Sequence, residues 1–215
     1  MTINKIIQLM LLGLVLSQPV IAGKVAPDQW SIQPLLTGSM APAFEATGAD
    51  GKNYRFQPDR LERPALIIFY RGGWCPYCNL HWAELRHIED QLLELDLDII
   101  FLSADQPSVL AEALDDGEQL PYYLLSDNTT VIAQAFGIAF KLDDETVGRY
   151  ANHPKIDIEA ASGYTHHVLP APAVFLTDRD GVIKFQYVNP DYKVRLHPDV
   201  LLAVARTMPE RRLKK

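Results

Sequence analysis

The segment "PALIIFYRGGWCPYCNLHWAEL", residues 64–85, holds both cysteines of the chain, Cys75 and Cys78. It starts with a short apolar run from Pro64 to Tyr70 that has β-branched members and is bounded by proline and glycine, which predicts a buried strand. Beyond the first cysteine, apolar residues recur at helical spacing as far as residue 95. These residues are Cys78, Trp82, Leu85, Ile88 and Leu92. Cys75 therefore falls where a strand ends and a helix begins.

This position favours a reactive thiol at Cys75. The unpaired N–H groups and the dipole at a helix N-terminus stabilise negative charge, so a thiol there ionises more easily, and the thiolate is the nucleophile. Pro76 suits the first helical turn because it has no N–H group to leave unpaired. Cys78 follows one turn later on the inward face, so we expect it to be the more buried thiol. It would then resolve a mixed disulfide or a sulfenic acid on Cys75 by closing a small disulfide ring.

Three other interpretations of the cysteine pair have to be weighed. Half of a zinc site would need more ligands; the chain has no second Cys-x-x-Cys, although His166 and His167 could serve. Haem attachment needs a histidine directly after the second cysteine, where this chain has Asn79. A purely structural bridge would close a very small loop and stabilise little. A Cys-x-x-Cys after a strand in a βα pattern is typical of a redox site.

The bulk composition narrows the class of protein. The chain has 215 residues, of which 48% are hydrophobic, an ordinary globular composition that predicts one domain. Its formal net charge of −7 makes nucleic acid an unfavourable partner. We expect no cofactor and no resident metal.

The first residues have the pattern of a secretory signal. Lys5 precedes an apolar run from Ile6 to Leu16, and Val20 and Ala22 put small residues at the expected cleavage positions. The run is too short to span a bilayer comfortably, although an uncleaved anchor is the alternative. We therefore expect residues 1–22 to be a signal peptide, with no integral membrane span after its cleavage. Export, to the bacterial periplasm in our interpretation, implies a compartment where disulfides persist.

The rest of the chain alternates strands and helices. Buried strands are predicted at residues 97–104 and 122–127, and helices at 108–118, 128–138 (capped by Asp127 or Asn128) and 197–208. Residues 172–188 predict two strands joined around Asp180-Gly181, and residues 38–56 predict a small extra hairpin. The insert at residues 141–169 is expected to add a helix and a loop over the sheet edge. Alternation predicts parallel strands with helices on both faces and an antiparallel hairpin at the edge.

At this point the chain resembles a known fold. The strand, loop and helix around "WCPYC", with Pro172 just before the strand "AVFLTD", resemble the thioredoxin fold. The resemblance implies that a cis bond before Pro172 packs beside the cysteine pair. We therefore expect residues 23–215 to form one α/β domain, a three-layer thioredoxin-like sandwich with a central mixed sheet, helices on both faces and an N-terminal hairpin extension.

Five segments, in this order, also resemble the AhpC/TSA peroxiredoxin-like family, over about Leu36 to Met208. They are "GSMAPAFEATGADGKNYRF", "IIFYRGGWCPYCNLHWAEL", "LSADQPSVL", "LPAPAVFLTDRDGVI" and "NPDYKVRLHP". The resemblance implies a peroxidatic or dithiol cysteine at Cys75 with Cys78 as its partner. Typical peroxiredoxins carry Thr or Ser three residues before the peroxidatic cysteine and Pro four further back, where this chain has Gly72 and Ile68.

Two further likenesses are partial. Thioredoxins usually place a buried acid six residues before the first cysteine, where this chain has Phe69. The inner dipeptide Pro76-Tyr77 is similar to that of glutaredoxins, although export removes the chain from cytosolic glutathione.

Other side chains are candidates for shaping the site. Arg71 could stabilise the Cys75 thiolate or a peroxide oxygen, or it could be a solvated loop charge. Trp74 is expected to shield the pair and to contact a partner, and Tyr77, in the inner dipeptide, is expected to shape the site. Arg195 belongs to a matching segment, and His81 is interpreted as a core histidine.

Three functions follow from these observations. The first is an exported thiol-dependent oxidoreductase that reduces peroxides through a Cys75/Cys78 dithiol-disulfide cycle, reset by an external dithiol reductant. The second is a dithiol-disulfide oxidoreductase that acts on protein disulfides. The third is a copper-binding carrier that uses the cysteines with His166 or His167.

Overall fold

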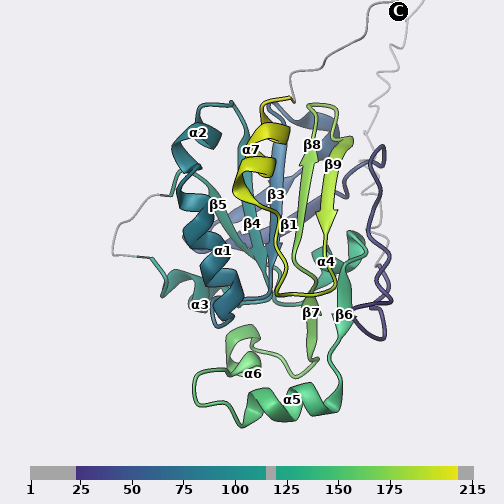
Figure 1. The fold of residues 1–215 in the computed structure, drawn as a ribbon, viewed down its shortest axis with the longest axis vertical. Helices are drawn as coiled ribbons and strands as arrows, with labels where there is room; N and C mark the ends of the chain where they lie inside the picture. Colours follow the sequence, from purple (N-terminus) through teal and green to yellow (C-terminus); the bar gives the residue numbers. More distant parts are fainter. Residues whose placement is uncertain (1–22, 115–119, 208–215) are drawn as a thin grey trace, which may run out of the picture.

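The computed structural model describes residues 23–114 and 120–207, and its centre is a seven-stranded mixed sheet in the order β2-β1-β5-β4-β3-β8-β9 (Figure 1). The strands of this sheet are β1 (Phe44–Gly48), β2 (Asn53–Phe56), β3 (Ala65–Tyr70), β4 (Asp98–Ser103), β5 (Tyr123–Ser126), β8 (Ala173–Thr177) and β9 (Ile183–Val188). Strands β3, β4 and β5 are parallel, and the hairpins β1–β2 and β8–β9 join them antiparallel. The predicted mixed sheet is confirmed.

Helices cover both faces of the sheet, as predicted. They are α1 (Pro76–Arg86), α2 (Glu89–Leu93), α3 (Pro107–Ala111), α4 (Val131–Ala135), α5 (Asp144–Ala151), α6 (Ile158–Ser162) and α7 (Pro198–Ala205), with a short 3-10 helix at Pro58–Arg60. Side chains of α1, α2, α3 and α7 pack in one buried cluster, and those of α4, α5 and α6 pack in the other. The result is three layers.

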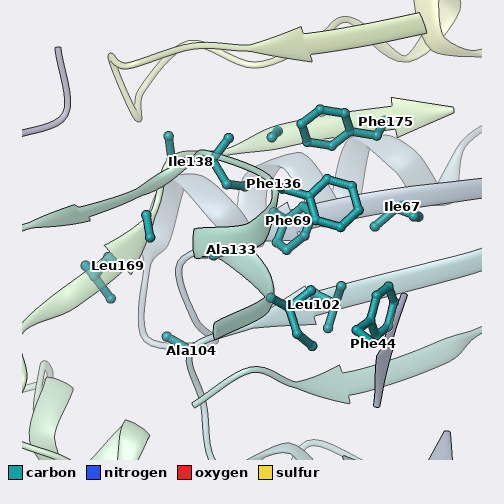
Figure 2. Close-up of a cluster of buried hydrophobic side chains, with 14 of the residues drawn as sticks. Phe44, Ile67, Phe69, Leu102, Ala104, Ala133, Phe136, Ile138, Leu169 and Phe175 are labelled. Atoms are coloured by element: carbon teal, nitrogen blue, oxygen red, sulfur yellow. The ribbon is translucent and has the colours of Figure 1, made fainter. Parts of the chain in front are cut away.

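Strand β3 shows why both clusters form. Successive side chains of a strand point to opposite faces, so Ile68 and Tyr70 enter the cluster under α1 while Ile67 and Phe69 enter the other. On that second face, Phe69, Phe136 and Phe175 meet with ring centroids 4.9–6.1 Å apart (Figure 2). Because β3 is buried on both sides, it holds the loop that follows it firmly.

The helix predicted over residues 75–95 is two helices. The amides of His87 and Ile88 bond to carbonyls three residues back, which tightens the last turn of α1. Ile88 then leaves helical geometry at φ −116° and ψ 3°. Ile88 and Leu92 both remain in the buried cluster, so the predicted apolar face is kept across the break.

Two other helix predictions need adjustment. Helix α3 is described only as far as Ala111, and the predicted end near Gly117 lies outside the described residues. Helix α4 begins at Val131, and Asp127 caps it with its side chain, which accepts the amides of Ile132 and Ala133 at 3.0 and 2.8 Å. The alternative cap, Asn128, instead donates from its side chain to the carbonyl of Ser162.

The segment predicted as an insert contains more helices and strands than the one helix and loop expected. Residues 139–170, which we call the insert, consist of strand β6 (Ala139–Lys141), helices α5 and α6, and strand β7 (Val168–Pro170), which pairs with β6. In Figure 1 the insert lies below the sheet, at the end where α1 begins. The amide of Gln106 donates to the carbonyl of Ala161 at 2.7 Å, so the insert is attached beside the end of β4.

The expected cis bond before Pro172 is wrong: the described residues contain no cis peptide bond. An extended trans chain leads from β7 into β8, with Ala171 donating to the Ile138 carbonyl at 2.8 Å and Asn189 donating to the Pro172 carbonyl at 3.3 Å. Trans is also the lower-energy form of an X–Pro bond. Since Phe69 pairs with Ala173, Pro172 still lies at the sheet edge from which the cysteine loop leaves.

The expected signal peptide, residues 1–22, lies outside the described residues. Within residues 23–114 and 120–207, no helix is long and apolar enough to cross a membrane.

Candidate active site

The two cysteines lie at the start of α1, directly after the loop that follows β3. Cys75 is the N-cap residue and Pro76 the first helical residue. The carbonyl of Cys75 accepts the amides of Cys78 and Asn79 at 3.0 and 3.1 Å, and Asn79 donates from its side chain to the Gly73 carbonyl at 3.0 Å. These bonds fix the loop to the first turn of the helix.

The two cysteines are not bridged to each other, and each has 1% of its surface exposed. Cys78 is enclosed by more protein than Cys75, as the helical stripe predicts. Both side chains belong to the cluster under α1, and Trp74 packs against that cluster from the loop. Solvent exposure alone does not distinguish the two thiols.

Their protonation does distinguish them. The pKa of Cys75 is lowered to about 6, mainly by a hydrogen bond from the Cys78 thiol and then by the charge of Arg71, although burial opposes the shift. The pKa of Cys78 is raised, because its proton serves that hydrogen bond and because it is buried. The arrangement therefore favours a thiolate at Cys75 and a thiol at Cys78.

Arg71 is buried, with 2% exposure, so the interpretation as a solvated loop charge is wrong. It donates to the Tyr150 hydroxyl at 2.7 Å, and its Cζ lies 4.2 Å from the ring centre of Tyr192 and 5.0 Å from that of Trp74. Among the described residues no carboxylate pairs with Arg71, and its Nε has no hydrogen-bond partner. A buried cation without a carboxylate favours an anion nearby, and the charge of Arg71 lowers the pKa of Cys75.

Arg195 reaches the second cysteine from the loop before α7. Its Nη2 lies 3.6 Å from Cys78 Sγ, while Nη1 donates to the carbonyls of Tyr192 and Val194. The rings of Tyr77 and Tyr192 meet edge to face at 5.7 Å. The structure thus brings together Cys75, Cys78, Arg71, Trp74, Pro76, Tyr77 and Arg195.

Asp105 is a residue of this region that sequence reasoning missed. It is buried, with 1% exposure, and its Oδ2 accepts the Gly73 amide at 2.8 Å and the Ser103 hydroxyl at 3.2 Å. Its pKa is raised to about 6, first by burial and additionally by the neighbouring Cys75. A usable signal existed: Asp105 directly follows a predicted parallel strand, and carboxyl ends of parallel strands meet at one edge.

The histidines have structural surroundings. His81 is buried, and burial followed by the charge of Arg195 lowers its pKa to about 4, which keeps it neutral. His166 contacts the Asn128 carbonyl through Nε2 at 2.8 Å and accepts the Val168 amide on Nδ1 at 3.0 Å.

The histidine pair shows no sign of a metal site. His167 pairs with Glu159 at 2.6 Å, and no group of three or more potential metal-ligating side chains is found in the described part of the chain. Nothing here supports copper binding.

The thioredoxin-like sheet and the Cys-x-x-Cys pair at the start of α1 define a thiol protein of the thioredoxin-fold class. Residues 37–186, more than half of the chain, match the sequence model of the AhpC/TSA family, and the chain belongs to this family.

Individual relatives agree with this assignment. The chain is 25% identical over 152 residues to the chloroplastic peroxiredoxin Q of Suaeda salsa, a match that covers 71% of this chain but only 59% of that relative. The chain therefore spans less than two thirds of that relative's length.

Solved structures share the fold. Peroxidoxin BcpB from Mycobacterium tuberculosis superposes with a TM-score of 0.58 at 20% identity, over 81% of this chain and 98% of that chain. Peroxiredoxin 6 of Arenicola marina, as a cysteine-to-serine mutant, gives a TM-score of 0.62 at 18% identity, over 80% and 73% of the two chains.

Proposed function

We propose that the protein is an exported, peroxiredoxin-like thiol peroxidase that works through a Cys75–Cys78 dithiol-disulfide cycle. The observation that carries this proposal is the separation of two thiols with the same small exposure into one of low pKa and one of raised pKa. A nucleophile and a proton-holding partner are thereby assigned within one helical turn. Membership in the AhpC/TSA family supports the same chemistry.

The first half of the cycle oxidises Cys75. Its thiolate attacks one peroxide oxygen, so that an S–O bond forms while the O–O bond breaks. The departing oxygen keeps the electron pair, gains a proton and leaves as water or an alcohol. The positive charge of Arg71 stabilises the Cys75 thiolate before the attack.

The second half closes the disulfide. Cys78 attacks the Cys75 sulfenic acid, the S–S bond forms, and the hydroxide that leaves combines with the Cys78 proton to give water. The charge of Arg195 favours the Cys78 thiolate and so assists this step. An external dithiol then reduces the disulfide by thiol–disulfide exchange and is itself oxidised.

The other residues shape the site. Trp74 and Tyr77 pack around Arg71 and Tyr192, Pro76 starts α1, and Pro172 lies at the sheet edge next to the loop. We assign no metal or cofactor to this cycle.

A specific observation favours a second candidate, reduction of protein disulfides. Tyr77 is 37% exposed and Leu80 is 63% exposed, so apolar side chains flank the cysteines where a protein partner could dock. Gly72 also lacks the hydroxyl that typical peroxiredoxins place there. The copper carrier has no comparable support, since both nitrogens of His166 are engaged.

Stopped-flow fluorescence tests the main proposal. Reduced protein is mixed with hydrogen peroxide while Trp fluorescence is followed, because Trp74 adjoins Cys75. We expect a second-order reaction at least about 10²-fold faster than that of free cysteine, absent in Cys75→Ser and retained in Cys78→Ser. Trapping of a sulfenic acid in Cys78→Ser serves as the matched control.

A rate no faster than that of free cysteine would reject the peroxidase. The same protein would then be assayed for reduction of an oxidised model protein, with Cys75→Ser as its control. Export is tested separately, by the N-terminal mass of the protein recovered from a periplasmic fraction, where we expect a chain beginning at Gly23.

A further inference from the structure

The end of β4 brings a carboxyl group to the cysteine loop. Strands β3 and β4 are parallel, with Tyr70 paired to Ser103, so Asp105 follows β4 beside the start of the loop. The Gly73 amide and the Ser103 hydroxyl both donate to Oδ2 of Asp105, and the Asp105 amide donates back to the Ser103 hydroxyl at 3.2 Å. The two bonds to Oδ2 hold the carboxyl group in one orientation, and the third holds the backbone of Asp105 against Ser103.

The other oxygen, Oδ1, is buried and has no hydrogen-bond partner within the described ranges 23–114 and 120–207. A buried acceptor without a donor costs free energy and calls for an explanation, such as a ligand or a proton. The carboxyl group also lies close enough to Cys75 for the two ionisations to influence each other. A carboxyl oxygen without a hydrogen-bond partner is therefore present within electrostatic range of the Cys75 thiol.

Gly72 shows where this oxygen points. A Cβ atom at position 72 would lie 2.6 Å from Asp105 Oδ1 and 2.3 Å from Trp74 Nε1. The space that a side chain at this position would fill is thus already occupied by a carboxyl oxygen and an indole. Typical peroxiredoxins have the hydroxyl of Thr or Ser at position 72, where this chain has glycine. Oδ1 of Asp105 occupies the space of that side chain and can donate a hydrogen bond when it is protonated.

We propose that Asp105, in its protonated form, is the general acid that delivers a proton to the leaving oxygen of the peroxide. This inference rests on the proposed peroxidase function. The Cys75 thiolate attacks the terminal oxygen of ROOH, the S–O bond forms and the O–O bond breaks, and the electron pair passes to the RO oxygen. Oδ1–H gives its proton to that oxygen, so ROH leaves. The site holds one negative charge before the step, on sulfur, and one after it, on the carboxylate.

The surroundings favour this proton. Burial raises the pKa of Asp105 to about 6, so an acid form persists close to neutral pH. Tyr70, which faces the carboxyl group from β3, has its own pKa raised by burial and stays neutral. Arg71 acts on Cys75 from the loop and lowers the pKa of that thiol through its charge.

Leaving-group dependence gives the test. Asp105→Asn keeps the shape and an acceptor for the Gly73 amide but removes the acidic proton. Second-order rate constants are measured for the reduced protein with hydrogen peroxide, whose leaving group needs a proton, and with peracetic acid, whose leaving acetate needs none. We expect a loss on the order of 10²-fold with hydrogen peroxide and less than about threefold with peracetic acid.

A matched control is Asp127→Asn, another buried carboxyl group at a strand end, which should leave both rate constants unchanged. Equal losses with the two peroxides in Asp105→Asn would reduce Asp105 to a structural role, and no loss would also reject the inference. If wild type itself reacts no faster than free cysteine, the proposed function fails first and this inference fails with it.

A second measurement does not depend on the variant folding. In wild type, the ratio of the hydrogen peroxide rate to the peracetic acid rate should fall as pH rises through about 6, where Asp105 loses its proton. Ionisation of Cys75 affects both peroxides alike and cancels in the ratio. A ratio that does not change between pH 5 and 7.5 would overturn the proposal.

Discussion

The ends of β4 and β5 carry the same kind of residue with different surroundings. Each strand ends in a serine, Ser103 or Ser126, and a buried aspartate follows, Asp105 or Asp127. Both oxygens of Asp127 accept amides from the first turn of α4, at 3.0 and 2.8 Å. Only one oxygen of Asp105 is bonded, and the other has no partner among the described residues.

The difference teaches which observation identifies a site residue. Burial raises the pKa of both groups, to about 7 for Asp127 and about 6 for Asp105, so a perturbed pKa does not separate them. The two aspartates are separated by the carboxyl oxygen of Asp105 that has no hydrogen-bond partner among the described residues. Asp127 caps the N-terminus of α4 with both of its oxygens. Asp105 has one oxygen without a hydrogen-bond partner among the described residues.

The largest expected effect comes from filling the space beside Asp105. Gly72→Ala would place a Cβ atom 2.6 Å from Oδ1 on a residue with φ +154°. Backbone strain and overpacking each cost about 1–3 kcal/mol, so we expect a loss of about 3–5 kcal/mol in unfolding free energy, measured by urea denaturation. Gly148→Ala, where a Cβ meets open space, is the control and should not destabilise. A loss of unfolding free energy below about 1 kcal/mol in Gly72→Ala would contradict the predicted crowding between a Cβ atom at position 72 and Asp105 Oδ1.

The next effect separates the two aspartates by pH. The folded pKa of Asp127 is raised from 3.8 to about 7, so its contribution to stability is fully present below about pH 4 and is lost as pH rises through 7. The stability of wild type relative to Asp127→Asn should therefore fall between pH 4 and 7.5, by up to about 4 kcal/mol. Urea denaturation at several pH values measures this difference, and a constant difference would refute the assignment. Peroxide reactivity should not change.

The smallest expected effect concerns Arg71, the buried cation whose charge acts on Cys75. Arg71→Gln removes a charge that helps lower the pKa of Cys75 to about 6. We expect this pKa to rise by about one unit, measured by thiolate absorbance against pH. Lys24→Gln, a surface charge change, should leave the titration unchanged. An unaltered Cys75 titration in Arg71→Gln would mean that the charge of Arg71 does not lower the pKa of Cys75.

Local sequence patterns predicted much of the framework. The apolar run before Tyr70, the cysteine at the start of a helix and the turn at Asp180-Gly181 all appear as expected. Each depends on neighbours within a few residues, which strand and helix periods describe well. The break at Ile88 was missed because the helical spacing of buried apolar residues continues through it, from Leu85 to Ile88 and Leu92.

The sequence by itself determined where the two thiols lie, which of them begins the helix, and the order of strands and helices around them. Only the tertiary structure decided what surrounds these thiols. Arg195 contacts Cys78 across 117 positions, Arg71 meets Tyr150 across 79, and Asp105 meets Gly73 across 32. The physical reason is that charge, burial and hydrogen-bond partners depend on which strand ends and loops meet at one sheet edge, and no local pattern specifies that meeting.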